Sequence, residues 1–168
     1  MTTIIETTDA AAANSTIYQM GIGDTFQGGF GSSGDNDWIE IVVQAGQTIN
    51  VLMTGTSGAI ATGNNVTVSI VNAAGLVIAA ETAFTDSTST TTYTNTTGAA
   101  QTLYIHATDF GNTDTGTYTV AVTTPTPLDA IDWGGSALAS PAVTVYFAAA
   151  GEVFDGVTSL GWTQTQIN

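Results

Sequence analysis

The residue types best suited to chemistry in this chain are carboxylates, and they are densest in the stretch Gly34-Asp-Asn-Asp-Trp38, at the entry to a predicted strand. Two carboxylates and an amide on a tight loop are hard oxygen ligands, which suit calcium. The same residues also suit an Asx turn, in which Asp35 would accept hydrogen bonds from nearby backbone amides. The loop alone leaves both interpretations open.

More acidic residues are available to such a loop from distant parts of the sequence. Glu6 and Asp9 lie in an N-terminal segment that can fold back beside it, and Asp109 and Asp114 lie in a loop before a predicted strand. Oxygen ligands for calcium commonly come from several segments of a chain, so these four acids are candidate partners of the loop.

The overall composition excludes several classes of protein. The 168 residues include 14 acidic side chains, one histidine, and no lysine, arginine or cysteine, which gives a formal net charge of −14. Without basic side chains the chain cannot neutralise phosphates, so we expect neither nucleic-acid binding nor binding to an anionic membrane surface. Disulfides and thiolate zinc sites are excluded as well. A strongly anionic surface favours cations as partners.

Enzymatic chemistry finds little support in the sequence. His106 has no second histidine to complete a zinc site, and neither a His-Glu-x-x-His motif nor a Gly-x-Ser-x-Gly motif occurs. The pair Asp129 and Asp132 has the side chains of a glycosidase, but its position after a proline-rich stretch favours a docking element. We therefore predict no catalytic residues and no organic cofactor.

The elements that must position the acids are predicted to be strands. Short runs rich in Thr, Val, Ile and Tyr alternate with breaks rich in Gly and Asn, which is typical of an all-β protein. The predicted strands are 38–44, 48–54, 66–72, 76–80, 90–95, 101–107, 116–123 and 143–148. Strands of this length joined by tight turns predict a jelly-roll-like antiparallel β-sandwich.

One boundary divides the chain. The stretch Thr123-Thr-Pro-Thr-Pro127 has the composition of an extended linker. We therefore divide the chain into an acidic N-terminal segment (1–14), a sandwich (15–124), a proline linker (125–127) and a tail (128–168) that contains one further strand.

The sandwich sequence resembles the bacterial pre-peptidase C-terminal domain. The similarity rests on Gly23-Asp-Thr-Phe-Gln-Gly28, on Gly34-Asp-Asn-Asp-Trp38 with Ala45-Gly-Gln47 after it, on 68–75, and on Thr115-Gly-Thr-Tyr-Thr-Val-Ala-Val122. The resemblance implies a jelly-roll-like sandwich that accompanies secreted proteases.

A calcium site is also implied by this resemblance. Some collagen-binding relatives chelate calcium with an N-terminal acidic segment and the acidic loop. Carried over residue by residue, the ligands here are Glu6, Asp9, Asp35 and Asp37. The family segment often reads Glu-Pro-Asn-Asp, whereas this chain has Glu6-Thr-Thr-Asp9.

The tail has a resemblance of its own. The stretches 128–134, 143–148 and 154–162 are similar to the opening of the catalytic domain of serralysin-type zinc metalloproteases. The zinc helix, third histidine, methionine turn and calcium β-roll of that family do not occur in the 168 residues, so we expect no zinc and no peptide cleavage. We expect this chain to be the N-terminal part of such an extracellular enzyme, or a short relative, with its export signal elsewhere.

Two functions follow as hypotheses. The first is a non-catalytic, calcium-binding accessory domain that acts on folding, positioning or substrate binding, with a protease catalytic domain or an extracellular protein substrate as its partner. The alternative is a self-assembling structural or adhesive subunit in which the strand 143–148 adds to the sheet of a neighbouring copy. A carbohydrate- or protein-binding module is a third hypothesis, based on aromatic residues expected at the surface.

Overall fold

The computed structural model describes residues 1–63, 66–85, 87–125, 153–154 and 157–158. The chain divides into two units, Met1–Pro125 and Thr126–Asn168. In the second unit the described residues form one antiparallel pair, β12 (Val153–Phe154) with β13 (Val157–Thr158). The predicted strand 143–148 lies outside the described residues.

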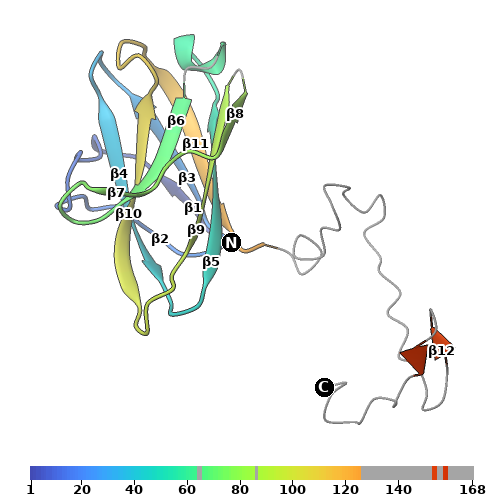
Figure 1. Ribbon diagram of the computed structural model, residues 1–168. Helices are drawn as coiled ribbons and strands as arrows, with labels where there is room; N and C mark the ends of the chain where they lie inside the picture. The colour runs from blue at the N-terminus through green and yellow to red at the C-terminus, as the bar shows by residue number, and fades with distance from the viewer. Residues whose placement is uncertain (64–65, 86, 126–152, 155–156, 159–168) are drawn as a thin grey trace. The chain divides into compact units, whose positions relative to one another are not determined.

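The first unit is a two-layer β-sandwich (Figure 1). One sheet has the strand order β1-β3-β11-β5-β9-β8, and the other has the order β2-β4-β10-β6-β7. Their bounds are β1 Thr3–Ile5, β2 Gln19–Met20, β3 Thr25–Phe30, β4 Asn36–Val43, β5 Thr48–Gly55, β6 Val66–Val71, β7 Val77–Ala79, β8 Ala83–Thr85, β9 Thr88–Thr94, β10 Gln101–Asp109 and β11 Gly116–Thr123, with a 3₁₀ turn, η1, at Ala59–Ala61.

The predicted all-β sandwich is confirmed, and its longest predicted strands appear as β4, β5, β6, β10 and β11. Most neighbours pair antiparallel, but β1 pairs with β3 and β2 pairs with β4 in parallel, so both sheets are mixed. The parallel pairs arise because residues 1–20 supply one short edge strand to each sheet. These strands of two or three residues are too short to show a periodic pattern in the sequence.

The core lies between the two sheets and follows the alternation of the strands. In β4 the side chains of Ile39, Ile41 and Val43 are fully buried on the inner face. Asp37 lies two residues before Ile39, so the same alternation directs its carboxylate into the interior. The strand pattern that builds the core therefore also buries an acid.

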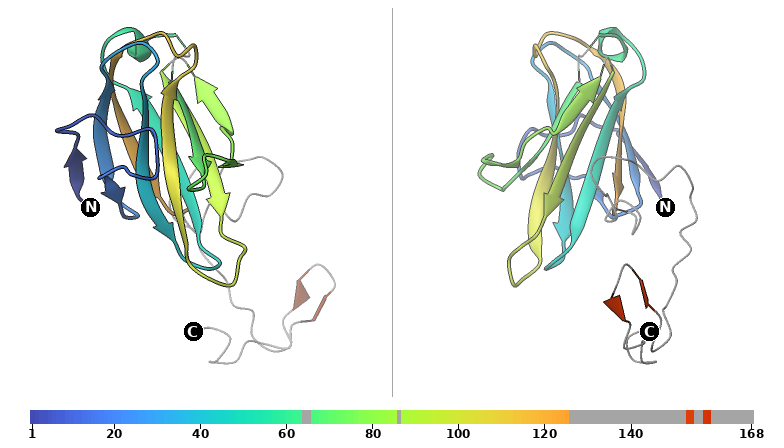
Figure 2. Two further views of the ribbon diagram at one scale, coloured as in Figure 1. Left: turned by 90° about the vertical axis from the view of Figure 1, so that its left-hand side faces the viewer. Right: turned by 45° about the vertical axis from the view of Figure 1, so that its right-hand side comes forward.

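The N-terminal strand β1 lies at the margin of its sheet, where two views of the sandwich show it beside β3 (Figure 2). Its partners in register are Thr3 with Thr25, Ile4 with Phe26 and Ile5 with Gln27. The segment 1–14 thus contributes a strand to the first unit. None of the described residues belongs to a helix long and apolar enough to span a membrane.

Candidate metal centre

Glu6 follows β1 directly and is held by backbone hydrogen bonds. Its N–H donates to the carbonyl of Gln27 at 2.9 Å, which extends the β1–β3 pairing by one residue. Its Oε1 accepts from the N–H of Ala10 and its Oε2 from the N–H of Gly29, both at 2.7 Å. The carboxylate therefore has a fixed position between the N-terminal segment and β3, with lone pairs to spare on both oxygens.

Asp37 occupies the first inward-facing position of β4 and has no exposed surface. Its Oδ2 accepts a hydrogen bond from the hydroxyl of Tyr118, which reaches across from β11 in the opposite sheet. Its Oδ1 is buried and has no hydrogen-bond partner among the described residues. A buried carboxylate oxygen without a donor is costly, so this atom is free to serve as a ligand for a cation.

The path of Tyr118 depends on a glycine in the neighbouring strand. Gly28 pairs with Tyr118 in register, and a Cβ at this position would lie 2.7 Å from the Tyr118 hydroxyl oxygen and 2.5 Å from the ring of Phe26. Such contacts are too close for any side chain other than hydrogen. Glycine here lets the tyrosine ring cross the core towards Asp37.

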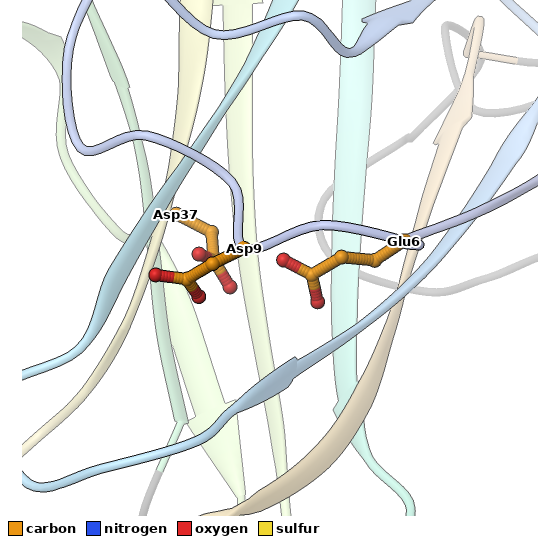
Figure 3. A group of neighbouring side chains, drawn as sticks. All are labelled: Glu6, Asp9 and Asp37. Atoms are coloured by element: carbon orange, nitrogen blue, oxygen red, sulfur yellow. The ribbon is translucent and has the colours of Figure 1, made fainter.

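Asp9 completes a cluster of three acids. Glu6, Asp9 and Asp37 each have a carboxylate oxygen within 4.8 Å of the others, and these carboxylates gather between the N-terminal segment and β4 (Figure 3). The three differ in burial: Asp37 is buried, Glu6 is half-buried and Asp9 is exposed. An open hollow of about 510 Å³ is lined in part by Ile5, Glu6 and Tyr118.

Burial and nearby negative charge shift the pKa values of side chains in and beside the cluster. Burial, and next the negative charges of Glu6, Asp35 and Asp9, raise the pKa of Asp37 to about 8, although the Tyr118 hydrogen bond opposes the rise. Burial also raises the pKa of Glu6, against its two backbone hydrogen bonds. Burial and the adjacent Asp37 raise the pKa of Tyr118, so its hydroxyl stays protonated and remains a donor.

Asp35, the fourth sequence-predicted ligand, has a different place. Its Oδ2 accepts from the N–H of Gly31 at 2.7 Å, and its own N–H donates to Ser32, which closes a turn. Gly34 takes a φ of 89° in that turn, a conformation that favours glycine. Asp35 therefore has the turn-closing role that the sequence left open, and it is not in the group of three, although its charge still raises the pKa of Asp37.

Asp109 and Asp114, the other candidate partners of the loop, are not in the group of three, and the pair Asp129 and Asp132 lies outside the described residues. Asp109 is buried at the end of β10, where its Oδ2 accepts from the N–H groups of Thr113 at 2.6 Å and Asp114 at 2.9 Å. The ring of His106 lies within 3.3 Å of the side-chain oxygen of Asn36 and packs edge-on against Trp38. Burial lowers the pKa of His106, so it is neutral at pH 7 and adds no positive charge near the acids.

Sequence reasoning missed Tyr118 and Tyr18. Tyr118 shows a usable signal, because it alternates with Val120 and Val122 and therefore faces the interior, where a hydroxyl needs a partner. Tyr18 precedes a strand of only two residues and carries no such signal.

The fold and the site together define a β-sandwich domain with a partly buried cluster of carboxylates beside its N-terminal strand. The sequence matches none of the protein families scanned. A search of curated proteins also gives no match. Among solved structures, the chain is similar to the pre-peptidase C-terminal domain of a collagenase from Bacillus anthracis, with 16% sequence identity, a TM-score of 0.49, and coverage of 63% of this chain and 93% of that chain.

Proposed function

We propose that the sandwich is a calcium-binding, non-catalytic accessory domain of a secreted zinc metalloprotease of the serralysin type. The observation that carries the calcium site is that one carboxylate oxygen from each of three acids lies within 4.8 Å of the others, and that Asp37, one of the three, has a buried Oδ1 with no hydrogen-bond partner among the described residues. The attachment to a protease is supported by the sequence motifs of the sandwich and the tail.

The donor set fits a hard divalent cation. Three carboxylates offer oxygen ligands only, and the chain contains no lysine or arginine that could balance them. Calcium accepts six to eight oxygens in flexible geometry, so it tolerates a site in which one ligand is buried and another is exposed. Glu6, Asp9 and Asp37 would hold the ion, and solvent would complete its shell on the side of Asp9.

Calcium at this position would link the N-terminal segment to the sandwich. Glu6 and Asp9 lie in that segment, whereas Asp37 belongs to β4. A ligand that binds only the folded state stabilises it by mass action, about 4 kcal/mol at a concentration of 1,000 times Kd. The ion would therefore rigidify the domain in the calcium-rich space outside a cell, where we expect the protein to act.

Calorimetric titration of calcium into the full chain, made metal-free beforehand, tests this function. We expect one saturable site, and we expect Asp9→Asn to weaken binding by about tenfold or more, because the number of charged ligands sets the affinity of such sites. The control is Glu40→Gln, which removes the same charge outside the cluster. Calcium binding that is absent, or that responds equally to both variants, would refute the proposed site.

Self-association is a second candidate, and an exposed apolar edge favours it. The strands β7 and β8 lie at the edges of the two sheets. Val77 in β7 is 51% exposed, Leu76 just before β7 is 64% exposed, and Phe84 in β8 is 56% exposed. Exposed apolar edge strands are sites for strand addition. The segment 143–148, which would supply the added strand, lies outside the described residues.

Light scattering during size-exclusion chromatography, in calcium and in metal-free buffer, distinguishes the two functions. A monomer in both conditions would refute self-association and would remain consistent with the accessory domain. Assemblies that disperse in both Phe84→Lys and Val145→Lys would support strand exchange between copies, since one substitution alters the edge and the other the added strand.

A further inference from the structure

Tyr18 makes more hydrogen bonds to the N-terminal segment than any other side chain described here. Its hydroxyl oxygen accepts from the N–H groups of Thr7 at 2.8 Å and Thr8 at 2.9 Å, and its proton goes to the carbonyl of Thr8 at 2.6 Å. One donor and two acceptor positions use the full capacity of a phenol. These contacts fall on the two residues that separate Glu6 from Asp9.

The other end of Tyr18 is attached to the strand that carries the third acid. Its carbonyl accepts from the N–H of Glu40 in β4 at 2.9 Å, where β2 runs parallel to β4. Its ring is 7% exposed and packs edge-on against Phe26, with 5.2 Å between the ring centroids. Tyr18 is thus fixed in the core and to β4 independently of the N-terminal segment.

We propose that Tyr18 is a positioning residue of the metal centre: its hydroxyl sets the backbone between Glu6 and Asp9 at a fixed place relative to β4, and so relative to Asp37. This inference rests on the proposed calcium site. Without the hydroxyl, the backbone of Thr7 and Thr8 loses its anchor, and the three carboxylates must be brought together when the ion binds. The free-energy cost of ordering this backbone would then lower the affinity for calcium.

The test compares calcium titration of the wild-type chain, Tyr18→Phe and Tyr93→Phe. Partners that orient metal ligands typically contribute 10- to 100-fold to metal affinity, so we expect Kd to rise by about that factor in Tyr18→Phe. Tyr93→Phe is the matched control, because it removes a half-buried tyrosine hydroxyl that donates to Gln101, away from the cluster. Its Kd is expected to equal that of the wild type.

A purely structural role for Tyr18 predicts a different pattern. The loss of core hydrogen bonds would lower thermal stability equally in calcium and in metal-free buffer, and would leave Kd unchanged. A positioning role predicts that the calcium-induced rise in melting temperature itself becomes smaller.

A second variant keeps the inference testable if Tyr18→Phe does not fold. Thr8→Gly alters an exposed side chain and loosens the same backbone, so it should weaken calcium binding in the same direction. An unchanged Kd in the folded variants would overturn the role of Tyr18 and leave the calcium site standing. A wild-type chain that binds no calcium would overturn both.

Discussion

Two buried aspartates of the sandwich, Asp37 and Asp109, differ in the groups that surround their carboxylates. Asp109 is 3% exposed and Asp37 is fully buried, and each has a buried Oδ1 without a partner among the described residues. Asp109 accepts two backbone N–H groups on its Oδ2 and closes the loop that follows β10. Asp37 accepts one hydroxyl and faces two further carboxylates.

The difference shows that burial of an acid does not by itself indicate a metal site. Asp109 accepts hydrogen bonds from two N–H groups of its own loop, and among the described residues it belongs to no group of three acids. Asp37 instead has two further carboxylates beside it, and burial, followed by the negative charges of Glu6, Asp35 and Asp9, raises its pKa to about 8. Burial together with two neighbouring carboxylates, rather than burial alone, makes Asp37 a candidate ligand.

The largest difference between the two aspartates should be in how their substitution changes the stabilisation of the protein by calcium. We expect saturating calcium to stabilise the wild type by about 4 kcal/mol at 1,000 times Kd. Asp37→Asn should abolish most of this gain, because it replaces a charged ligand, whereas Asp109→Asn should retain it. Thermal unfolding with and without calcium measures both.

Equal loss of the calcium response in the two variants would contradict this distinction, because it would mean that either substitution damages the fold as a whole. Circular dichroism of each variant in metal-free buffer controls for that outcome.

The second effect is a pH dependence of stability that the raised pKa of Asp37 should produce. Its pKa is raised from 3.8 to about 8 in the folded protein, so between these values the folded state binds more protons than the unfolded state. In metal-free buffer, stability should therefore be greatest at the acidic end and fall as pH rises towards 8, by at most about 1.4 kcal/mol per pH unit. The rise in the pKa of Glu6 acts in the same direction.

Excess calcium should weaken or reverse this trend, since the ion competes with protons for the same oxygens. Urea unfolding between pH 5 and 8 measures the slope, and Asp37→Asn should flatten it while Asp109→Asn does not. A slope that persists in Asp37→Asn would assign the titration to other groups.

The third effect tests the role of Asp109 in its loop. Asp109→Ala removes the acceptor of two N–H groups, and each donor left without a partner costs about 1–3 kcal/mol. We expect a loss of about 2 kcal/mol or more that is the same in calcium and in metal-free buffer, read from urea unfolding. A loss that appears only in calcium would place Asp109 in a metal site and remove the contrast with Asp37.

The sequence predicted the parts of this arrangement that depend on local pattern. Alternation over 38–44 predicted β4, and the same alternation directs Asp37 inward. The approach of Glu6 and Asp9 was proposed from a fold-back of the N-terminal segment and from the family resemblance. The geometry of that approach was not predictable, because it depends on the parallel pairing of a three-residue strand with β3. Contacts between residues far apart in the sequence were also not predictable: the hydroxyl of Tyr118 donates a hydrogen bond to Asp37, 81 residues earlier in the chain.

Asp35 is the sequence-predicted ligand that is not in the group of three, and its substitution should have the smallest effect on stabilisation by calcium. Its spacing from Asp37 suggested a shared site, but Asp35 precedes β4 and its carboxylate accepts from Gly31 in its own turn. We expect Asp35→Asn to leave the calcium response within about 0.5 kcal/mol of the wild type, because its carboxylate is not in the group of three acids. Asp9→Asn is the matched comparison, because it removes one exposed charge from within the cluster. If calcium titration shows the two variants equally weakened, then the ion draws on four acids and the turn at Asp35 rearranges to bind it. If only Asp9→Asn is weakened, then the cluster ends at the three acids that the fold brings together.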